Sequence, residues 1–380
     1  MSGITLMMLG NFALASGATP SSLYLWGGNY NGAGARNLTG SAGENSSPIQ
    51  LGSATDWLQF SGSYNFVGTR KSGYLYNCGD GRFGAWNTNS NTSSPIQIGS
   101  LTNWTGGVLT QEGVTCHVIK KDGSLWGWGA NDQGAVGNGV KVGMEQISSP
   151  VQIGSLTTWA WCTGGGNTSA QAIKTDGTLW AWGPATQGGL GNGSTSTNYS
   201  SPIQIGSLTN WSKVATGGEN HQVAIKTDGT LWTWGNNNYG QLGLNDTSLR
   251  NSPVQVGSST GWTAVGAGYQ TSGAIDAGKL YMAGRNNNGE VGQNNTVNPQ
   301  KLFVQVGALT TWEDIKPGNA ITLAKKTDGT IWAWGANWNG QTGVSDVVKR
   351  SSPVQIGSAT NWTAIHLGSA QSAAAMGGRA

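Results

Sequence analysis

The sequence has little charge and no concentrated basic segment. Asp, Glu, Lys and Arg make up 10% of the 380 residues, and the net charge is only +3. An ordinary soluble domain has roughly a quarter of its residues charged. Proteins that bind nucleic acids cluster Lys and Arg on one face or in a tail. We therefore expect no nucleic-acid partner.

The sequence also has few cysteines. Cys78, Cys116 and Cys162 lie 38 and 46 residues apart. This spacing fits no zinc-binding pattern, and an odd number of cysteines cannot pair fully. We expect them to be small buried side chains.

Long hydrophobic runs are lacking as well. Residues 4–18 are apolar, but the stretch is too short and too interrupted to span a bilayer. A secretory signal would require a Lys or Arg before the apolar stretch, and none precedes it. We expect no membrane span and no cleaved signal peptide. We interpret residues 1–20 as an apolar arm or strand that precedes a single domain over residues 21–380. In this arm, Leu6 and Leu9 are candidates for docking on a partner.

What the sequence does have is glycine, tryptophan and a repeat. There are 63 glycines and 19 tryptophans, and the motif Leu-Trp-x-Trp-Gly occurs seven times, some copies being degenerate. The closing glycines are 49 to 54 residues apart. A second motif, Ser-Pro-x-Gln-x-Gly followed by a tryptophan, recurs in step, and its sixth copy has Leu302-Phe303 in place of Ser-Pro.

A period near 50 residues with several short apolar runs is typical of a propeller blade of four strands. The sequence therefore predicts an all-β, seven-bladed β-propeller with four-stranded antiparallel blades. The first half-repeat, 23–52, and the last, 362–376, each supply two strands. We expect one blade to be closed by strands from both termini, which leaves no open edge between the first and last blades.

The Leu-Trp-x-Trp strand is apolar on both faces, as expected where blades pack on either side. We predict that its tryptophans form the blade core, and stacking on a sugar is the alternative for one that is exposed. The residues concerned are Trp126, Trp128, Trp180, Trp182, Trp232, Trp234, Trp332 and Trp334.

The segment 224–243 reads Ala-Ile-Lys-Thr-Asp-Gly-Thr-Leu-Trp-Thr-Trp-Gly-Asn-Asn-Asn-Tyr-Gly-Gln-Leu-Gly. It resembles the repeat of the RCC1 (regulator of chromosome condensation) family, and the resemblance covers essentially the whole chain. It implies a seven-bladed propeller whose termini share a blade. Founding members are guanine-nucleotide exchange factors that use an inserted β-wedge and a basic tail. This sequence has neither, so the resemblance carries over the fold and no functional residue. The compact repeat also resembles insertion-free proteins of bacteria and phages.

The sequence shows no catalytic or metal-binding set. His117, His221 and His366 occupy different positions in their repeats and have no ligand-spaced partner. No Gly-Lys-Ser/Thr follows the glycine-rich segments, which excludes a P-loop. We expect no enzymatic activity, no cofactor and no metal. Each Asp-Gly turn is preceded by a lysine, and we expect these turns to form a solvated ring of alternating charge; the lysines are Lys120, Lys174, Lys226 and Lys326.

One loop, between the Leu-Trp strand and the Ser-Pro strand, differs in every repeat. Variable loops on a rigid scaffold are a common design for binding, and drift on a solvent-facing rim is the alternative. The candidate partner-binding residues in these loops are Lys141, Met144, Tyr199, Arg250 and Lys349.

We therefore expect a non-enzymatic structural or binding propeller. The first hypothesis is a component of a larger assembly, such as a phage virion (capsid decoration, fibre or receptor-binding protein) or a cell surface. It would contact protein partners or a host receptor or glycan, in a virion or at the extracellular surface. The alternative is a soluble protein-interaction regulator, such as a guanine-nucleotide exchange factor for a small GTPase.

Overall fold

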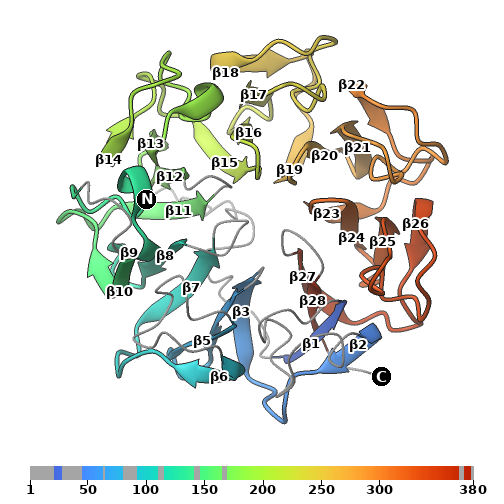
Figure 1. The fold of residues 1–380 in the computed structure, drawn as a ribbon, viewed down its shortest axis with the longest axis horizontal. Helices are drawn as coiled ribbons and strands as arrows, with labels where there is room; N and C mark the ends of the chain where they lie inside the picture. The colour runs from blue at the N-terminus through green and yellow to red at the C-terminus, as the bar shows by residue number, and fades with distance from the viewer. Residues whose placement is uncertain are drawn as a thin grey trace, which may run out of the picture.

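The computed structural model describes residues 21–27, 45–62, 65–79, 92–109, 115–140, 146–164, 169–367 and 372–377. These residues form seven four-stranded antiparallel sheets arranged around a central axis (Figure 1). We number the sheets as blades 1 to 7. In each blade the strand that begins with the Ser-Pro-linked tryptophan lies innermost (Figure 1).

The strands are listed here from the inside of each blade outwards. Blade 1 has β3 (Trp57–Gly62), β4 (Asn65–Arg70), β5 (Leu75–Gly79) and β6 (Thr92–Gln97); blade 2 has β7 (Trp104–Leu109), β8 (Thr115–Lys120), β9 (Leu125–Ala130) and β10 (Gln146–Gln152). Blade 3 has β11 (Trp159–Gly164), β12 (Ala170–Lys174), β13 (Leu179–Gly183) and β14 (Tyr199–Gln204); blade 4 has β15 (Trp211–Thr216), β16 (His221–Lys226), β17 (Leu231–Gly235) and β18 (Arg250–Val256). Blade 5 has β19 (Trp262–Ala267), β20 (Thr271–Asp276), β21 (Lys279–Gly284) and β22 (Gln300–Gln305); blade 6 has β23 (Trp312–Pro317), β24 (Ile321–Lys326), β25 (Ile331–Gly335) and β26 (Arg350–Gln355). Blade 7 has β27 (Trp362–Leu367), β28 (Ser372–Gly377), β1 (Ser22–Gly27) and β2 (Asn45–Gln50). Two short 3-10 turns lie in other blades: η4 (Asp132–Gly134) follows β9 in blade 2, and η6 (Thr186–Gly188) follows β13 in blade 3.

Blade 7 closes the ring with strands from both ends of the chain. Its strand order is β2-β1-β28-β27, and Leu23 of β1 lies opposite Met376 of β28. Figure 1 shows the blue first strands beside the red last ones. The predicted fold and its closure are confirmed.

The hairpin between the second and third strands requires its glycine. Gly229 has a φ of +77°, which L side chains rarely adopt, and a Cβ there would lie 1.9 Å from the Thr260 carbonyl oxygen. Asp228 fixes the same turn, because its carboxylate accepts hydrogen bonds from both the amide and the hydroxyl of Thr230. The Asp-Gly signal therefore marks both the turn and its close approach to the next blade.

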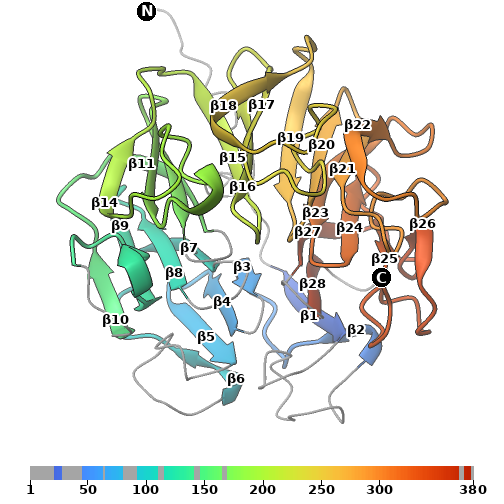
Figure 2. The same ribbon diagram turned by 45° about the horizontal axis from the view of Figure 1, so that its top comes forward.

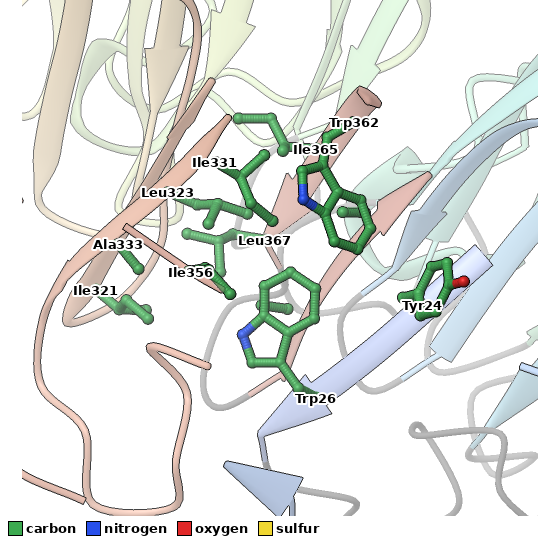
Figure 3. Close-up of a cluster of buried hydrophobic side chains, with 12 residues drawn as sticks. Tyr24, Trp26, Ile321, Leu323, Ile331, Ala333, Ile356, Trp362, Ile365 and Leu367 are labelled. Atoms are coloured by element: carbon green, nitrogen blue, oxygen red, sulfur yellow. The ribbon is translucent and has the colours of Figure 1, made fainter. Parts of the chain in front are cut away.

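The second tryptophan of each motif forms the core between blades. Trp128, Trp182, Trp234 and Trp334 have no exposed surface, and neither does Trp26 in blade 7. Figure 3 shows Trp26 packed with apolar side chains of blade 6, among them Ile331 and Ile356. The indole nitrogens also connect the blades: Trp182, Trp234, Trp334 and Trp26 donate to carbonyl oxygens of Ala135, Gly189, Glu290 and Gln341 in the preceding blade.

The first tryptophan of each motif is only partly buried and supports a lysine. The Nζ of the lysine before the turn lies 3.4 to 3.6 Å from the ring centroid of Trp126, Trp180, Trp232 or Trp332. These lysines are 5 to 8% exposed, and burial lowers their pKa. The expected solvated ring is therefore wrong for the lysines, because each folds back over the indole instead of entering solvent. The aspartates of the same turns are exposed.

The outer edge strands are protected by proline in six blades. Pro removes an amide that a foreign strand could use. In blade 5 Phe303 takes this place, and the neighbouring Leu302 instead forms an antiparallel bridge with Leu244 of blade 4. The prolines are Pro48, Pro95, Pro150, Pro202, Pro253 and Pro353.

The three cysteines are buried and unpaired with one another, as expected. Burial raises the pKa of all three thiols, that of Cys162 to about 12. His117 and His221 are fully buried, and burial lowers the pKa of each to about 4. His366 is half-buried. The arm over residues 1–20 lies outside the described residues. Within the described part of the chain, no helix is long and apolar enough to cross a membrane.

Candidate functional site

Each blade presents two ends, which form the two faces of the ring (Figure 2). One carries the Asp-Gly hairpins and the connections between blades; we call it the turn face. The other carries the connection between the first two strands and the variable loop between the last two; we call it the loop face. The antiparallel register fixes this division, because Gly235, at the end of β17, lies opposite both His221 and Arg250.

The variable loops of blades 4 and 6 share one internal framework. The Nδ2 of Asn237 donates to the carbonyl and carboxylate oxygens of Asp246, both at 3.0 Å. The Nδ2 of Asn337 makes the same two bonds to Asp346, at 2.8 and 2.9 Å. Buried asparagines thus fix the path of both loops.

The predicted partner-binding residues have four different outcomes. Leu6, Leu9, Lys141 and Met144 lie outside the described residues. Tyr199 packs partly buried against a hydrophobic cluster of blades 3 and 4. Arg250 is paired with Asp246 at 2.6 Å and braces its own loop, as Arg350 does with Asp346 at 2.5 Å. Lys349 is exposed at the tip of the blade 6 loop.

The sequence prediction missed three apolar residues beside Lys349. Trp338, Val347 and Val348 are 60, 62 and 57% exposed. The Nδ2 of Asn337, next to Trp338, donates to the Val348 carbonyl at 3.2 Å, so all three residues belong to one loop tip. We call Trp338, Val347, Val348 and Lys349 the blade 6 tip. The available signal was that Trp338 is a tryptophan outside both repeated motifs.

A second feature of the loop face is a polar network across blades 3, 4 and 5. Glu219 accepts a hydrogen bond from the Nε2 of Gln270 at 2.6 Å and a weak one from Asn236 at 3.4 Å. Asn236 also donates to Gln187 of blade 3 at 3.0 Å, and Arg285 donates to Gln270 at 2.8 Å. The side chains of Asn236 and Gln270 are buried.

The Glu219 carboxylate is half-buried, and this burial raises its pKa. The hydrogen bond from Gln270 and the charge of Arg285 act in the opposite direction. Arg285 itself is held by the buried Glu290 at 3.3 Å. The network can therefore hold loops of three neighbouring blades in register and present a carboxylate on the loop face.

Neither feature has the composition of a metal site or catalytic centre. Among the described residues, no group of three or more His, Cys, Asp or Glu side chains could hold a metal ion. The two fully buried histidines lie within strands, and the Nε2 of His117 and that of His221 donate to the backbone carbonyl oxygens of Val136 and Thr271. The loop face offers apolar tips, an exposed lysine and a fixed carboxylate, which are groups suited to binding.

Comparison with known proteins supports this architecture. The family model "Regulator of chromosome condensation (RCC1) repeat" matches residues 122–170, 176–225, 228–275 and 328–375, and a second model of the same description matches 211–241. The ultraviolet-B receptor UVR8 of Arabidopsis thaliana is 31% identical over 242 residues, 61% of this chain and 52% of that protein. The probable E3 ubiquitin-protein ligase HERC3 of Homo sapiens is 32% identical over 201 residues, 50% of this chain and 19% of that protein.

Solved structures show the same fold at low identity. The crystal structure of Prp20p from Saccharomyces cerevisiae has a TM-score of 0.81 at 16% identity and covers 95% of this chain and 92% of that one. Human WBSCR16 also gives 0.81 at 16% identity, over 94 and 98% of the two chains. The chain spans only about half of UVR8 and a fifth of HERC3. The RCC1 repeat models, however, cover half of this chain. With the seven blades and their repeated motifs, this places the chain in the RCC1 repeat family.

Proposed function

We propose that this chain is a non-enzymatic protein-interaction propeller that regulates a soluble partner, and that it binds through the loop face. The observation that carries the proposal is the construction of that face, where the same internal framework supports tips of different composition in blades 4 and 6. A framework fixed before binding reduces the ordering cost of association.

The relatives support a regulator better than a particle component. UVR8 is named as a receptor and HERC3 as a probable ligase, and Prp20p binds Gsp1p and histones. None of them supports the phage-virion interpretation. A guanine-nucleotide exchange factor for a small GTPase is one specific form of the regulator hypothesis. The repeats of this chain are too evenly spaced to contain a long inserted wedge, so we do not assign that activity.

The proposal is tested by site-specific photo-crosslinking in the native host. The photoreactive residue is placed at Thr247 or Val347 on the loop face, and at the exposed Leu156 or Leu208 on the turn face as matched controls. We expect a discrete protein adduct from loop-face positions only. Adducts from the turn face alone would refute the assignment of the binding face. Release of labelled GDP from the GTPase, if one is crosslinked, would identify the exchange activity.

A further inference from the structure

The loops of blades 4 and 6 form a natural matched pair. They share the Asn-Asp bonds and the Asp-Arg ion pair, described above, at nearly the same distances. Their tips differ in chemistry. Blade 4 presents Asn238, Thr247 and Ser248 where blade 6 presents Trp338, Val347 and Val348. A common framework therefore carries a polar tip in one blade and an apolar tip in the other.

The exposure of the blade 6 tip is not required by the fold. The described tryptophans of the repeated motifs are buried or half-buried, whereas Trp338 is 60% exposed. Blade 4 shows that the same loop forms with polar residues at the three positions that correspond to Trp338, Val347 and Val348. Scattered exposed apolar residues are ordinary, but a tryptophan and two valines gathered on one rigid tip indicate a contact surface.

The charge beside this tip is positive. Arg350 is neutralised by Asp346 at 2.5 Å. Lys349 is exposed and forms no ion pair with any described residue. Blade 4 has Leu249 in the equivalent position. A partner that covers the apolar tip would gain from a carboxylate placed opposite Lys349.

We propose that the blade 6 tip is the docking site for a protein segment that presents apolar side chains flanked by a carboxylate. This inference rests on the proposed binding role of the loop face and names the blade and the chemistry of the partner. Trp338 is the anchor, Val347 and Val348 extend the apolar contact, and Lys349 selects an acidic neighbour. Tryptophan is among the residues that most often dominate binding energy at interfaces.

The test uses the whole chain and a displayed library of random peptides. Peptides are selected on the wild-type protein and then measured against a graft variant that carries the blade 4 tip, Trp338→Asn, Val347→Thr and Val348→Ser. The framework residues are untouched, so the graft should fold, and an unchanged Tm verifies this. Leu249→Ser removes the exposed apolar residue of blade 4 and is the matched control.

We expect the selected peptides to combine apolar residues with Asp or Glu. The graft should weaken their binding at least about 30-fold, which corresponds to a hot spot of about 2 kcal/mol. Lys349→Glu should weaken it and shift selection towards basic peptides, and Leu249→Ser should leave it unchanged.

Three results would overturn the inference. The first is that no peptide prefers the wild-type protein to the graft. The second is that the apolar peptides bind without regard to the charge at position 349. The third is that the tip binds vesicles of phosphatidylcholine and phosphatidylserine, or a glycan array, in place of peptides. Crosslinks from Thr247 but not Val347 would keep the loop face as the binding face while rejecting the blade 6 tip, so the two proposals fail separately.

Discussion

The contact between Gly191 and Trp234 provides a quantitative test of how the blades are held together. Gly191, in blade 3, has a φ of +80°, and a Cβ there would lie 2.6 Å from the indole nitrogen of Trp234. That indole is fully buried and donates to the Gly189 carbonyl at 3.2 Å. Gly191→Ala should therefore displace a buried ring as well as strain the backbone.

Gly206 separates the two effects. Its φ is +64°, but a Cβ there would meet nothing within 4 Å. Gly206→Ala should cost about 1 kcal/mol, the backbone term alone. Gly191→Ala adds overpacking of about 1–3 kcal/mol and weakens one buried hydrogen bond of about 1 kcal/mol, for a total of roughly 3–5 kcal/mol.

The two variants are compared by urea unfolding followed by tryptophan fluorescence and by far-ultraviolet circular dichroism. Coincident curves from the two probes would justify a two-state treatment of the free energy of unfolding. The midpoint should fall several times further for Gly191→Ala than for Gly206→Ala. Equal losses would refute the argument that the indole, rather than the left-handed backbone, is what requires glycine at position 191.

Three further predictions concern charge and closure. First, stability should fall as the pH drops from about 6.5 towards 4, because unfolded His117 and His221 bind protons that the buried rings, with a pKa of about 4, do not. The loss of unfolding free energy is on the order of 3 kcal/mol per histidine below pH 4. In thermal unfolding, His117→Gln should make Tm depend less steeply on pH than in the wild-type protein. An unchanged dependence of Tm on pH would contradict the role given to His117. Second, Lys226→Met should cost about 1–2 kcal/mol, because its Nζ lies 3.4 Å from the Trp232 ring, whereas Lys121→Met at an exposed site should cost nearly nothing in the same unfolding assay. Third, Trp26→Phe should remove the bond to Gln341 and speed hydrogen exchange in β1 and β28 more than in β15 and β16; uniform protection would show that this bond does not hold the ring closed.

The repeat made the fold predictable, because every level of the sequence agreed. The tryptophan spacing, the Asp-Gly turns and the split of one repeat between the chain ends all indicated the same closed ring. The lysines were mispredicted because sequence places Lys226 beside a turn but does not show what lies across the sheet. Lys226 lies on β16, opposite Trp211 of β15, and Trp232 lies on β17 on the other side of β16. The rings of both tryptophans cover the lysine.

The site was less predictable, because variability marks a loop without saying which residues face outwards. The loop position of Arg250 makes it a binding candidate in the sequence, and the structure pairs it with Asp246. The shared Asp-x-x-x-Arg spacing of residues 246–250 and 346–350 was the available signal for a structural role. Trp338 had no counterpart in other repeats, but its exposure depends on a loop path that only the three-dimensional bonds of Asn337 determine.

Those bonds explain how the tip of one blade can change while the path of its loop is kept. Asn286 of blade 5 donates to the carbonyl of Asn295 and to that of Val297, as Asn337 does to Asp346 and Val348. The acceptors are largely backbone oxygens, which every residue supplies. The loop path is therefore nearly independent of the side chains at the tip. Substitution at a tip changes what the loop face can bind while the blade core, held by the buried indoles, stays the same.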